Sequence, residues 1–303
     1  MMKLISVSSF LPLGLISAHD YHVPEKWETH PTRLPTPISD LSATLDPESG
    51  LVFLMGGCSS PLGNERIPNT TYFSCADITD SSHAFDPETG EITTLPDLPR
   101  ERFRHTAALS NGRIWLIGGR DVNDVLIPQV DVYDIASKSW LSKGLVLPSD
   151  FLTSDLASFG VGELIYVMGG YDQNYTEAVN TTFSIKTDQP LSESTLTVQK
   201  LTDLKHARGD AHVGVANGQA YLIGGFTHVD DYCEALDTVE RYDWVENTWS
   251  TADELQYRRG DKAVVVIDNT KIYAIGGESN TDCTGPGQRT TPTTEVEVLD
   301  TSE

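Results

Sequence analysis

Residues 104–119 read RHTAALSNGRIWLIGG, and this stretch decides the fold. Apolar and polar side chains alternate on both sides of Asn111-Gly112. An Asn-Gly pair between two alternating runs is a strong β-hairpin signal, because both central residues of the turn need a positive φ. The second run ends in the doublet Gly118-Gly119, and Trp115 stands three residues before it. The stretch therefore predicts two antiparallel strands that end at a pair of glycines.

The same doublet occurs five times, each time with an aromatic residue three places before its first glycine. The doublets are Gly56-Gly57 (after Phe53), Gly118-Gly119 (after Trp115), Gly169-Gly170 (after Tyr166), Gly224-Gly225 (after Tyr221) and Gly276-Gly277 (after Tyr273). Successive doublets are 62, 51, 55 and 52 residues apart. A period near fifty residues without helical patterning is typical of a propeller-type repeat.

A third run follows most doublets and ends in an aromatic or apolar residue before an aspartate. These pairs are Phe85-Asp86, Tyr133-Asp134, Tyr242-Asp243 and Leu299-Asp300. Ile92, Trp140 and Trp249 stand seven residues after the first three of these runs. Each unit is therefore predicted to be four antiparallel strands. A single four-stranded sheet cannot bury both of its faces, so neighbouring sheets must stack on it around an axis.

The doublets, the aromatic-Asp pairs and the Trp spacing together resemble the kelch repeat. The resemblance implies an all-β fold, a β-propeller of five kelch-type four-stranded blades. The blades are expected near 39–95, 100–145, 150–202, 206–253 and 258–303, with inner strands near 42–46, 104–109, 155–160, 211–216 and 262–267. The third copy departs from the pattern, because Pro190 stands where a tryptophan is expected after Phe183.

The fifth copy reaches Glu303 before any fourth strand. Trp27 lies in a short run upstream of the first inner strand, so residues near 24–30 are expected to supply that strand and close the ring. Closure would remove open sheet edges that invite aggregation. The alternative is that Trp27 lies on a loose arm.

Several features favour a secreted or secretory-pathway protein. Residues 1–18 have the layout of a secretory signal peptide. Four cysteines in such a chain suggest two disulfides, Cys58–Cys75 and Cys233–Cys283. A zinc site is the alternative, but it is disfavoured because the sequence contains no CxxC spacing. Asn69, Asn174 and Asn180 begin Asn-x-Thr sequons, which predicts glycosylation.

The formal net charge of −23 argues against nucleic-acid binding. No segment is long and apolar enough to predict a membrane span. We expect a monomer with no cofactor and with an unknown protein, peptide or glycan ligand.

Basic residues gather just before or at the start of three predicted inner strands. The candidate ligand-binding residues are Arg102, Arg104, His105, Arg208, His212 and Arg259. If they surround the mouth of a central channel, they should attract an anionic peptide or glycan. The alternative is that each arginine pairs with a nearby acid, such as Asp210 or Asp261, and ties blades together. The tripeptides Arg208-Gly209-Asp210 and Arg259-Gly260-Asp261 spell an integrin-binding motif, but the repeat explains them.

The sequence contains no G-x-S-x-G, phosphate-loop or HExxH motif, so no catalytic residue is assigned. The predicted function is a non-catalytic binding module. The alternative is a carbohydrate-active epimerase or mutarotase that uses an arginine and an acid in the channel. A third reading is a structural matrix component without a specific site.

Overall fold

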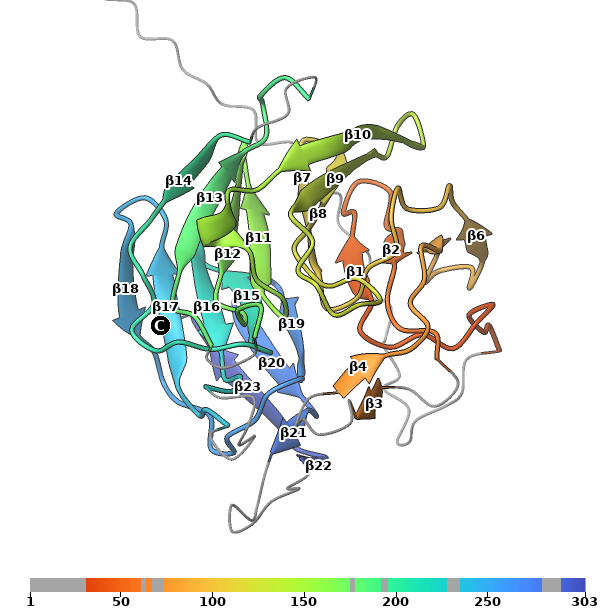
Figure 1. Ribbon diagram of the computed structural model, residues 1–303. Helices are drawn as coiled ribbons and strands as arrows, with labels where there is room; N and C mark the ends of the chain where they lie inside the picture. The colour runs from red at the N-terminus through yellow and green to blue at the C-terminus, as the bar shows by residue number, and fades with distance from the viewer. Residues whose placement is uncertain are drawn as a thin grey trace, which may run out of the picture. The chain divides into compact units, whose positions relative to one another are not determined.

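In the computed structural model, each repeat is an antiparallel sheet whose strands neighbour one another in chain order (Figure 1). The structure describes residues 31–60, 64–66, 73–174, 178–191, 196–227, 235–279 and 290–302. We number the sheets as blades 1 to 5. Blade 1 contains β1 (Ser42–Leu45), β2 (Val52–Met55), β5 (Ser82–Phe85) and β6 (Ile92–Thr94); blade 2 contains β7 (Thr106–Ser110), β8 (Arg113–Ile117), β9 (Gln129–Asp134) and β10 (Ser139–Val146); blade 3 contains β11 (Ala157–Val161), β12 (Leu164–Met168), β13 (Thr182–Lys186) and β14 (Val198–Lys200); blade 4 contains β15 (His212–Ala216), β16 (Gln219–Ile223), β17 (Val239–Asp243) and β18 (Thr248–Thr251); blade 5 contains β19 (Ala263–Ile267), β20 (Lys271–Ile275) and β23 (Val296–Asp300).

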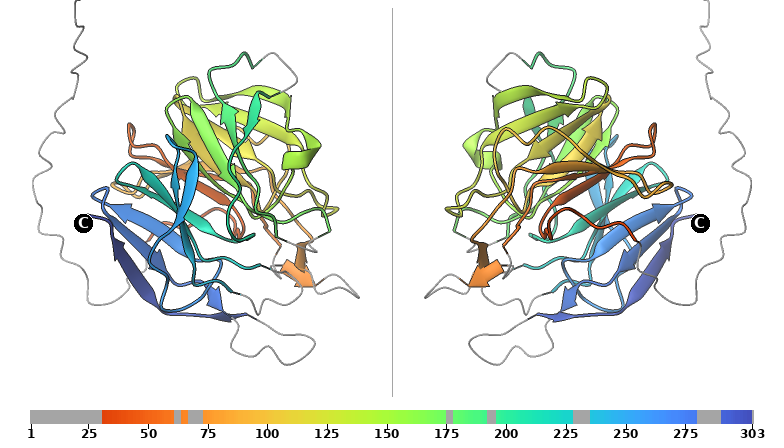
Figure 2. Two further views of the ribbon diagram at one scale, coloured as in Figure 1. Left: turned by 90° about the vertical axis from the view of Figure 1, so that its left-hand side faces the viewer. Right: turned by 90° about the vertical axis from the view of Figure 1, so that its right-hand side faces the viewer.

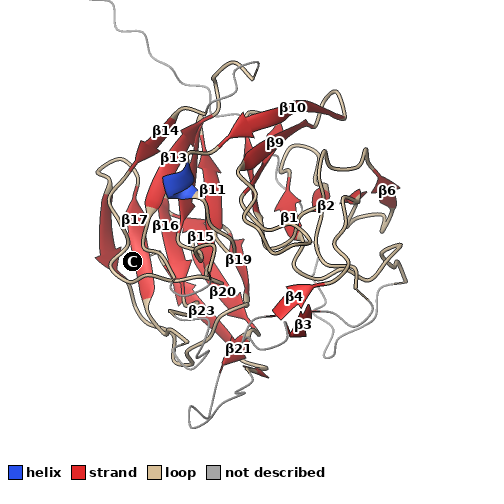
Figure 3. Cartoon of the chain, viewed as in Figure 1, coloured by secondary structure: helices blue, strands red, loops and turns tan. Residues whose placement is uncertain are grey.

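Two short pairs lie outside the blades, β3 (Asn64–Arg66) with β4 (Phe73–Cys75) and β21 (Glu278–Ser279) with β22 (Thr291–Pro292). Both belong to connections between the second and third strands of a blade, and Figure 2 shows them at one edge of the molecule. The link from each blade to the next reaches the same edge, since the strands are antiparallel. We call this edge the mouth face. The only helix in the described residues is a 3-10 turn, Ser149–Phe151 (Figure 3).

The five-bladed propeller predicted from the sequence is confirmed. Asn111 and Asn217 have φ of 53° and 47°, as a two-residue Asn-Gly turn requires. The five first strands contact one another in succession, so they are the inner strands of the propeller. The third blade also has a fourth strand: Val198 pairs with Ile185 after a hairpin longer than in the other repeats, and the seven-residue spacing therefore missed it.

Apolar layers between successive blades form the core. Phe53 and Met55 of blade 1 pack with Ile114 and Leu116 of blade 2, and equivalent clusters join blades 2 to 3, 3 to 4 and 4 to 5. Among the described residues, no such cluster joins blade 5 to blade 1. Aliphatic side chains on one face of blade 5 instead remain 43–58% exposed: Val265, Ile267, Val296 and Val298.

The predicted disulfide Cys58–Cys75 is present, with an S–S distance of 1.98 Å. Asn174 and Asn180 are exposed. Several other expectations fall outside the described residues: the signal peptide 1–18, the closing strand at 24–30, Asn69, and the pair Cys233 and Cys283.

The glycine doublets allow close approach between blades. Gly118 has φ +68°, and a Cβ atom on it would lie 2.5 Å from the carbonyl oxygen of Thr153 in the link to blade 3. The N–H of Gly119 donates to that same oxygen at 3.3 Å. A side chain at Gly118 would therefore separate two blades that are joined by their backbones.

Gly118→Ala should lower the free energy of unfolding by about 3 kcal/mol or more, because it adds overlap with backbone to an unfavourable φ. Gly112→Ala is the matched control: its φ is +66°, yet nothing lies within 4 Å of the added Cβ. It should cost only about 1–2 kcal/mol. Urea unfolding of both variants would measure the difference, and equal losses would contradict a packing role for the doublet.

Candidate functional site

The three arginines predicted to surround the mouth are completely buried. Arg102, Arg208 and Arg259 each have a relative exposure of 0%. Arg102 pairs with Asp131 of β9 and donates to the carbonyls of Gly118 and Gln129, each at 3.1 Å. Arg102 lies on the link that leads into blade 2. Its side chain thereby connects this link with the second and third strands of the blade.

Arg208 makes the same contacts in blade 4. Its guanidinium lies 2.7 Å from Glu240 and donates to the carbonyls of Gly224 at 2.9 Å and Thr238 at 3.0 Å. In blade 5, Arg259 pairs with Glu297 and donates to the carbonyl of Ala274 at 3.2 Å. The Nε atoms of Arg102 and Arg259 have no hydrogen-bond partner among the described residues, but they are buried like the rest of each guanidinium. A guanidinium enclosed by an acid and several carbonyls in this way presents no donor on the surface to a ligand.

The backbone carbonyls of these arginines hold the preceding blade. The N–H groups of Gly57, Gly170 and Gly225 donate to the carbonyls of Arg102, Arg208 and Arg259 at 2.8, 2.8 and 3.0 Å. Each arginine therefore binds its own blade with its side chain and the previous blade with its backbone. This geometry fits the alternative that the arginines tie blades together. Their acidic partners, however, are on third strands and are not Asp210 or Asp261.

The partner acids occupy one repeat position, two residues before the end-of-strand residues Tyr133, Tyr242 and Leu299. In blades 1 and 3, where the arginine position holds Ile38 and Thr153, the acid position holds His83 and Phe183. Each blade therefore has either both the arginine and the acid at these positions or neither of them. This pairing across repeats is the signal that sequence reasoning missed.

Both Arg-Gly-Asp tripeptides are built into this interface. A Cβ atom on Gly209 would overlap the ring of Tyr171 in the preceding blade, and one on Gly260 would overlap the ring of Phe226. Glycine is needed there because an aromatic ring covers it, and the arginine before it is buried. Neither tripeptide therefore offers its arginine on the surface.

A ring of five equivalent residues lies where the links enter the inner strands. It consists of Asp40, Arg104, Asp155, Asp210 and Asp261, each two residues before an inner strand and each with φ between 49° and 56°. Backbone N–H groups connect it from blade to blade: Arg104 to Asp40 O, Asp155 to Arg104 O, Asp210 to Asp155 O and Asp261 to Asp210 O, at 2.9–3.2 Å. We call these five residues the central ring.

The central ring holds four carboxyl groups and one guanidinium. The Arg104 Nε lies 3.9 Å from an oxygen of Asp40 and 3.7 Å from one of Asp155, and the Tyr171 hydroxyl donates to Asp210 at 2.9 Å. Desolvation by the surrounding protein, together with the neighbouring carboxylates, raises the pKa of Asp261 to about 7 and that of Asp210 well above its ordinary range, although the Asp261 side chain keeps contact with solvent. Burial also raises the pKa of Asp155. The crowded carboxyl groups would be stabilised by an added cation.

The histidines near the ring remain neutral at physiological pH. His105 is 7% exposed and its Nε2 lies 3.0 Å from the Ser42 hydroxyl; burial, with the charge of Arg102, lowers its pKa to about 3. His212 keeps contact with solvent, but the protein that surrounds it, together with the charge of Lys262, lowers its pKa to about 3. Lys262 is 1% exposed and its Nζ has no hydrogen-bond partner among the described residues. Burial, with Arg208 and Arg259 nearby, lowers its pKa to about 7.

The alternative of an epimerase or mutarotase requires an arginine and an acid within hydrogen-bonding distance, and the structure contains such a pair. Arg208 and Glu240 meet at 2.7 Å, but their side chains are 0% and 1% exposed. A substrate could not reach either group without opening the blade. Within the described residues, no cluster of three His, Cys, Asp or Glu side chains could hold a metal ion, and no helix is long and apolar enough to cross a membrane.

Comparison with known proteins agrees with the repeat architecture. The family model "Kelch motif" matches residues 207–256, which include the buried Arg208 and the doublet of blade 4. Residues 207–256 therefore match a kelch motif, and the relatives found by comparison are kelch-repeat proteins. The chain is 28% identical over 198 residues to the Kelch repeat protein M-T8 of Myxoma virus (strain Lausanne), covering 64% of this chain and 35% of that protein.

A second relative is Kelch-like protein 34 of Homo sapiens, 23% identical over 246 residues, or 81% of this chain and 36% of that protein. The chain thus spans about a third of the length of these relatives. Among solved structures, "Structure of YjhT" matches with a TM-score of 0.63 and 15% identity over 87% of this chain and 84% of that one. At that identity, the match supports the fold alone.

Arg208→Ala should cost about 3–5 kcal/mol of stability, because it leaves Glu240 buried without its countercharge. The matched control is Arg258→Ala, which removes an arginine that is 58% exposed and pairs with Asp237 at 3.2 Å. An exposed pair of this kind contributes about 0–1 kcal/mol. Denaturant unfolding would compare them, and an Arg208→Ala loss as small as that of the control would contradict the structural role.

Asp261→Asn should stabilise the protein above pH 7 but not near pH 4. The pKa of Asp261 is raised to about 7 in the folded state, so the ionised carboxylate opposes folding above that pH and the amide does not. As the pH falls toward the ordinary aspartate pKa near 4, the carboxyl group is protonated in both states and the advantage disappears. Asparagine also tolerates the positive φ. Melting temperatures of both proteins between pH 4 and 8 would measure this, and a constant difference would refute it.

Proposed function

We propose that this protein is a non-catalytic binding module whose mouth face binds a basic segment of a protein partner. Kelch-repeat propellers are typically protein-interaction modules, which supports a binding role. The observation that carries the charge preference is the burial of Arg102, Arg208 and Arg259 in ion pairs. With these arginines inside, the central ring is left with four carboxyl groups and one guanidinium.

The links on the mouth face carry further acids. Exposed carboxylates include Asp97, Glu101, Asp150, Asp253 and Glu254. The net charge of −23 gives the whole protein a field that attracts cations. Both observations favour a lysine- or arginine-rich partner over the anionic peptide or glycan expected from the sequence.

The rigidity of the central ring supports binding without catalysis. Its backbone is held by hydrogen bonds between blades, and burial together with neighbouring carboxylates raises the pKa values of Asp155, Asp210 and Asp261. A cation placed among them would relieve this repulsion, which is a binding function that needs no reacting group. The arginine–acid pairs that an epimerase or mutarotase would use are buried, so we propose that the protein is not an enzyme.

An oligolysine peptide should bind the full chain, and an oligoglutamine peptide of equal length should not. Affinity should fall by about tenfold or more when NaCl rises from about 50 to about 500 mM, because exposed charges are screened. The double variant Asp40→Asn/Asp261→Asn should weaken binding.

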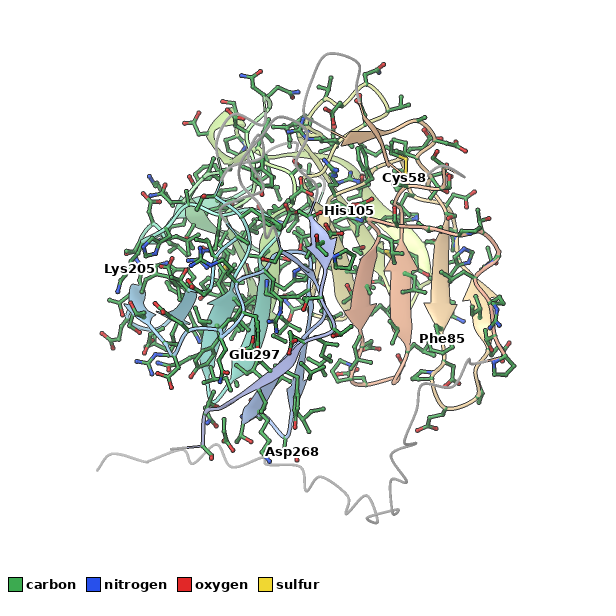
Figure 4. All side chains as sticks on the ribbon, turned by 90° about the horizontal axis from the view of Figure 1, so that it is seen from below. Cys58, Phe85, His105, Lys205, Asp268 and Glu297 are labelled. Atoms are coloured by element: carbon green, nitrogen blue, oxygen red, sulfur yellow. A yellow bond between two sulfur atoms is a disulfide. The ribbon has the colours of Figure 1, made fainter. Side chains whose placement is uncertain are left out.

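The control is Asp268→Asn. Asp268 is exposed and has a similar φ of 51°, but it lies at the other end of blade 5, away from His105 (Figure 4). Calorimetric titration of the three proteins would decide. Equal affinity for both peptides, or equal weakening by the Asp268 variant, would refute a basic-segment site at the mouth.

We also propose that the protein passes through the secretory pathway. Support comes from the Cys58–Cys75 disulfide, which persists in oxidising compartments, and from the exposed sequons at Asn174 and Asn180. Expression in a secreting eukaryotic cell should place the protein in the medium. Removal of N-glycans should lower its mass, and Asn174→Gln/Asn180→Gln should reduce that shift. Retention in the cytosol with free thiols would contradict the proposal.

A further inference from the structure

One part of the central ring contains its own cation, and the other part does not. Arg104 lies between Asp40 and Asp155 in the order of the ring, with its Nε 3.9 Å from the first carboxyl group and 3.7 Å from the second. Asp210 and Asp261 follow on the next two links. In the part of the chain that the structure describes, neither of them forms an ion pair, and the Asp261 carboxyl group accepts no hydrogen bond. The one side-chain donor to Asp210 is an uncharged hydroxyl, at 2.9 Å.

The lysine beside Asp261 does not supply the countercharge. Lys262 is the next residue, but its side chain is buried and its Nζ has no hydrogen-bond partner among the described residues. The Nζ lies 3.1 Å from the position of a Cβ atom on Gly224, so it points at the glycine doublet of blade 4. Asp210 and Asp261 therefore lack the kind of contact that Arg104 gives to its two neighbours.

Asp155 adds an unused acceptor to these two carboxyl groups. Its side chain is 9% exposed, and its Oδ2 has no hydrogen-bond partner within the described residues. Its charge acts on both Asp210 and Asp261, so the carboxyl group faces these residues across the ring. A buried carboxylate oxygen without a donor is costly, and a donor that reaches it would remove this cost.

The arrangement suits an ammonium group better than a metal ion or a guanidinium. The described residues contain no group of three acids, histidines or cysteines that could hold a metal ion. An N–H···O contact of about 2.8–3.0 Å spans a wider ring than metal–oxygen bonds of about 2.0–2.5 Å. An ammonium group has three donors that point in different directions, whereas the donors of a guanidinium lie in one plane. Asp155, Asp210 and Asp261 are three consecutive members of the ring, and Asp261 is exposed, so a cation can enter from that side.

We propose that the central ring binds one lysine side chain of the basic segment, with its ammonium group held by Asp155, Asp210 and Asp261. This inference rests on the proposed function and names the chemical group that enters the ring. Arg104 already serves Asp40, so the ammonium group occupies the part of the ring that has no cation of its own.

A small amine tests the site apart from any peptide. n-Butylammonium should bind the full chain at pH 8, where Asp261, with its pKa of about 7, is ionised, and NMR titration should shift the amide signals of residues 210 and 261. n-Butyltrimethylammonium has the same charge but no N–H group, so it should bind about fivefold more weakly or worse. Asp210→Asn should weaken n-butylammonium binding by about fivefold or more, and asparagine tolerates the positive φ of this position. Asp268→Asn is the control and should leave the affinity unchanged.

Peptides then show whether the ammonium group comes from a lysine side chain. Oligolysine should bind about threefold more tightly or better than oligoarginine of equal length, and Asp155→Asn/Asp210→Asn should remove this preference. Equal binding of the two small cations, or CaCl2 binding at the same amides more tightly than n-butylammonium, would overturn the inference. Equal binding of the two peptides would overturn it too, while leaving the basic-segment function in place. If neither peptide bound, the proposed function would fall, whereas loss of n-butylammonium binding in Asp210→Asn would still support an ammonium site.

Discussion

The hydrogen bond from the second glycine of each doublet to the next link is the contact on which the propeller depends. It recurs in blades 1 to 4, at 2.8–3.3 Å, and brings two backbones together where the inner strands begin. A Cβ atom on the first glycine would come within 2.7 Å of a carbonyl oxygen in each of these blades. No other residue allows both the positive φ and this approach, which explains why the doublet marks blades 1 to 4.

Buried ion pairs then fix each link to its own blade. Removing a guanidinium from water is costly, and the cost is met only where a carboxylate and several carbonyls surround it. Blades 2, 4 and 5 meet that condition with Asp131, Glu240 and Glu297, whereas blades 1 and 3 have neither the arginine nor the acid. Because these arginines are buried in ion pairs, they are not available to an anionic ligand, and this determines the kind of ligand that we propose.

In the central ring, the fold brings together charged residues that are about fifty residues apart in the sequence. Each member adopts a positive φ because the chain turns there from link to inner strand, a conformation that Asp tolerates well. The turns stack by backbone hydrogen bonds, so four carboxyl groups are gathered whether or not they repel one another. The raised pKa values of Asp155, Asp210 and Asp261 follow from burial and from this enforced proximity.

The sequence by itself determined the five repeats, the Asn-Gly hairpins, the inner strands and the Cys58–Cys75 disulfide, because these depend on local turn chemistry and on a period that can be counted. It did not determine which way Arg102, Arg208 and Arg259 point. That direction depends on Asp131, Glu240 and Glu297, which lie 29 to 38 residues further along the chain and approach only after the third strand has paired. Tertiary structure alone decided that these three arginines are internal ties, since a charge is buried only where folding supplies its countercharge.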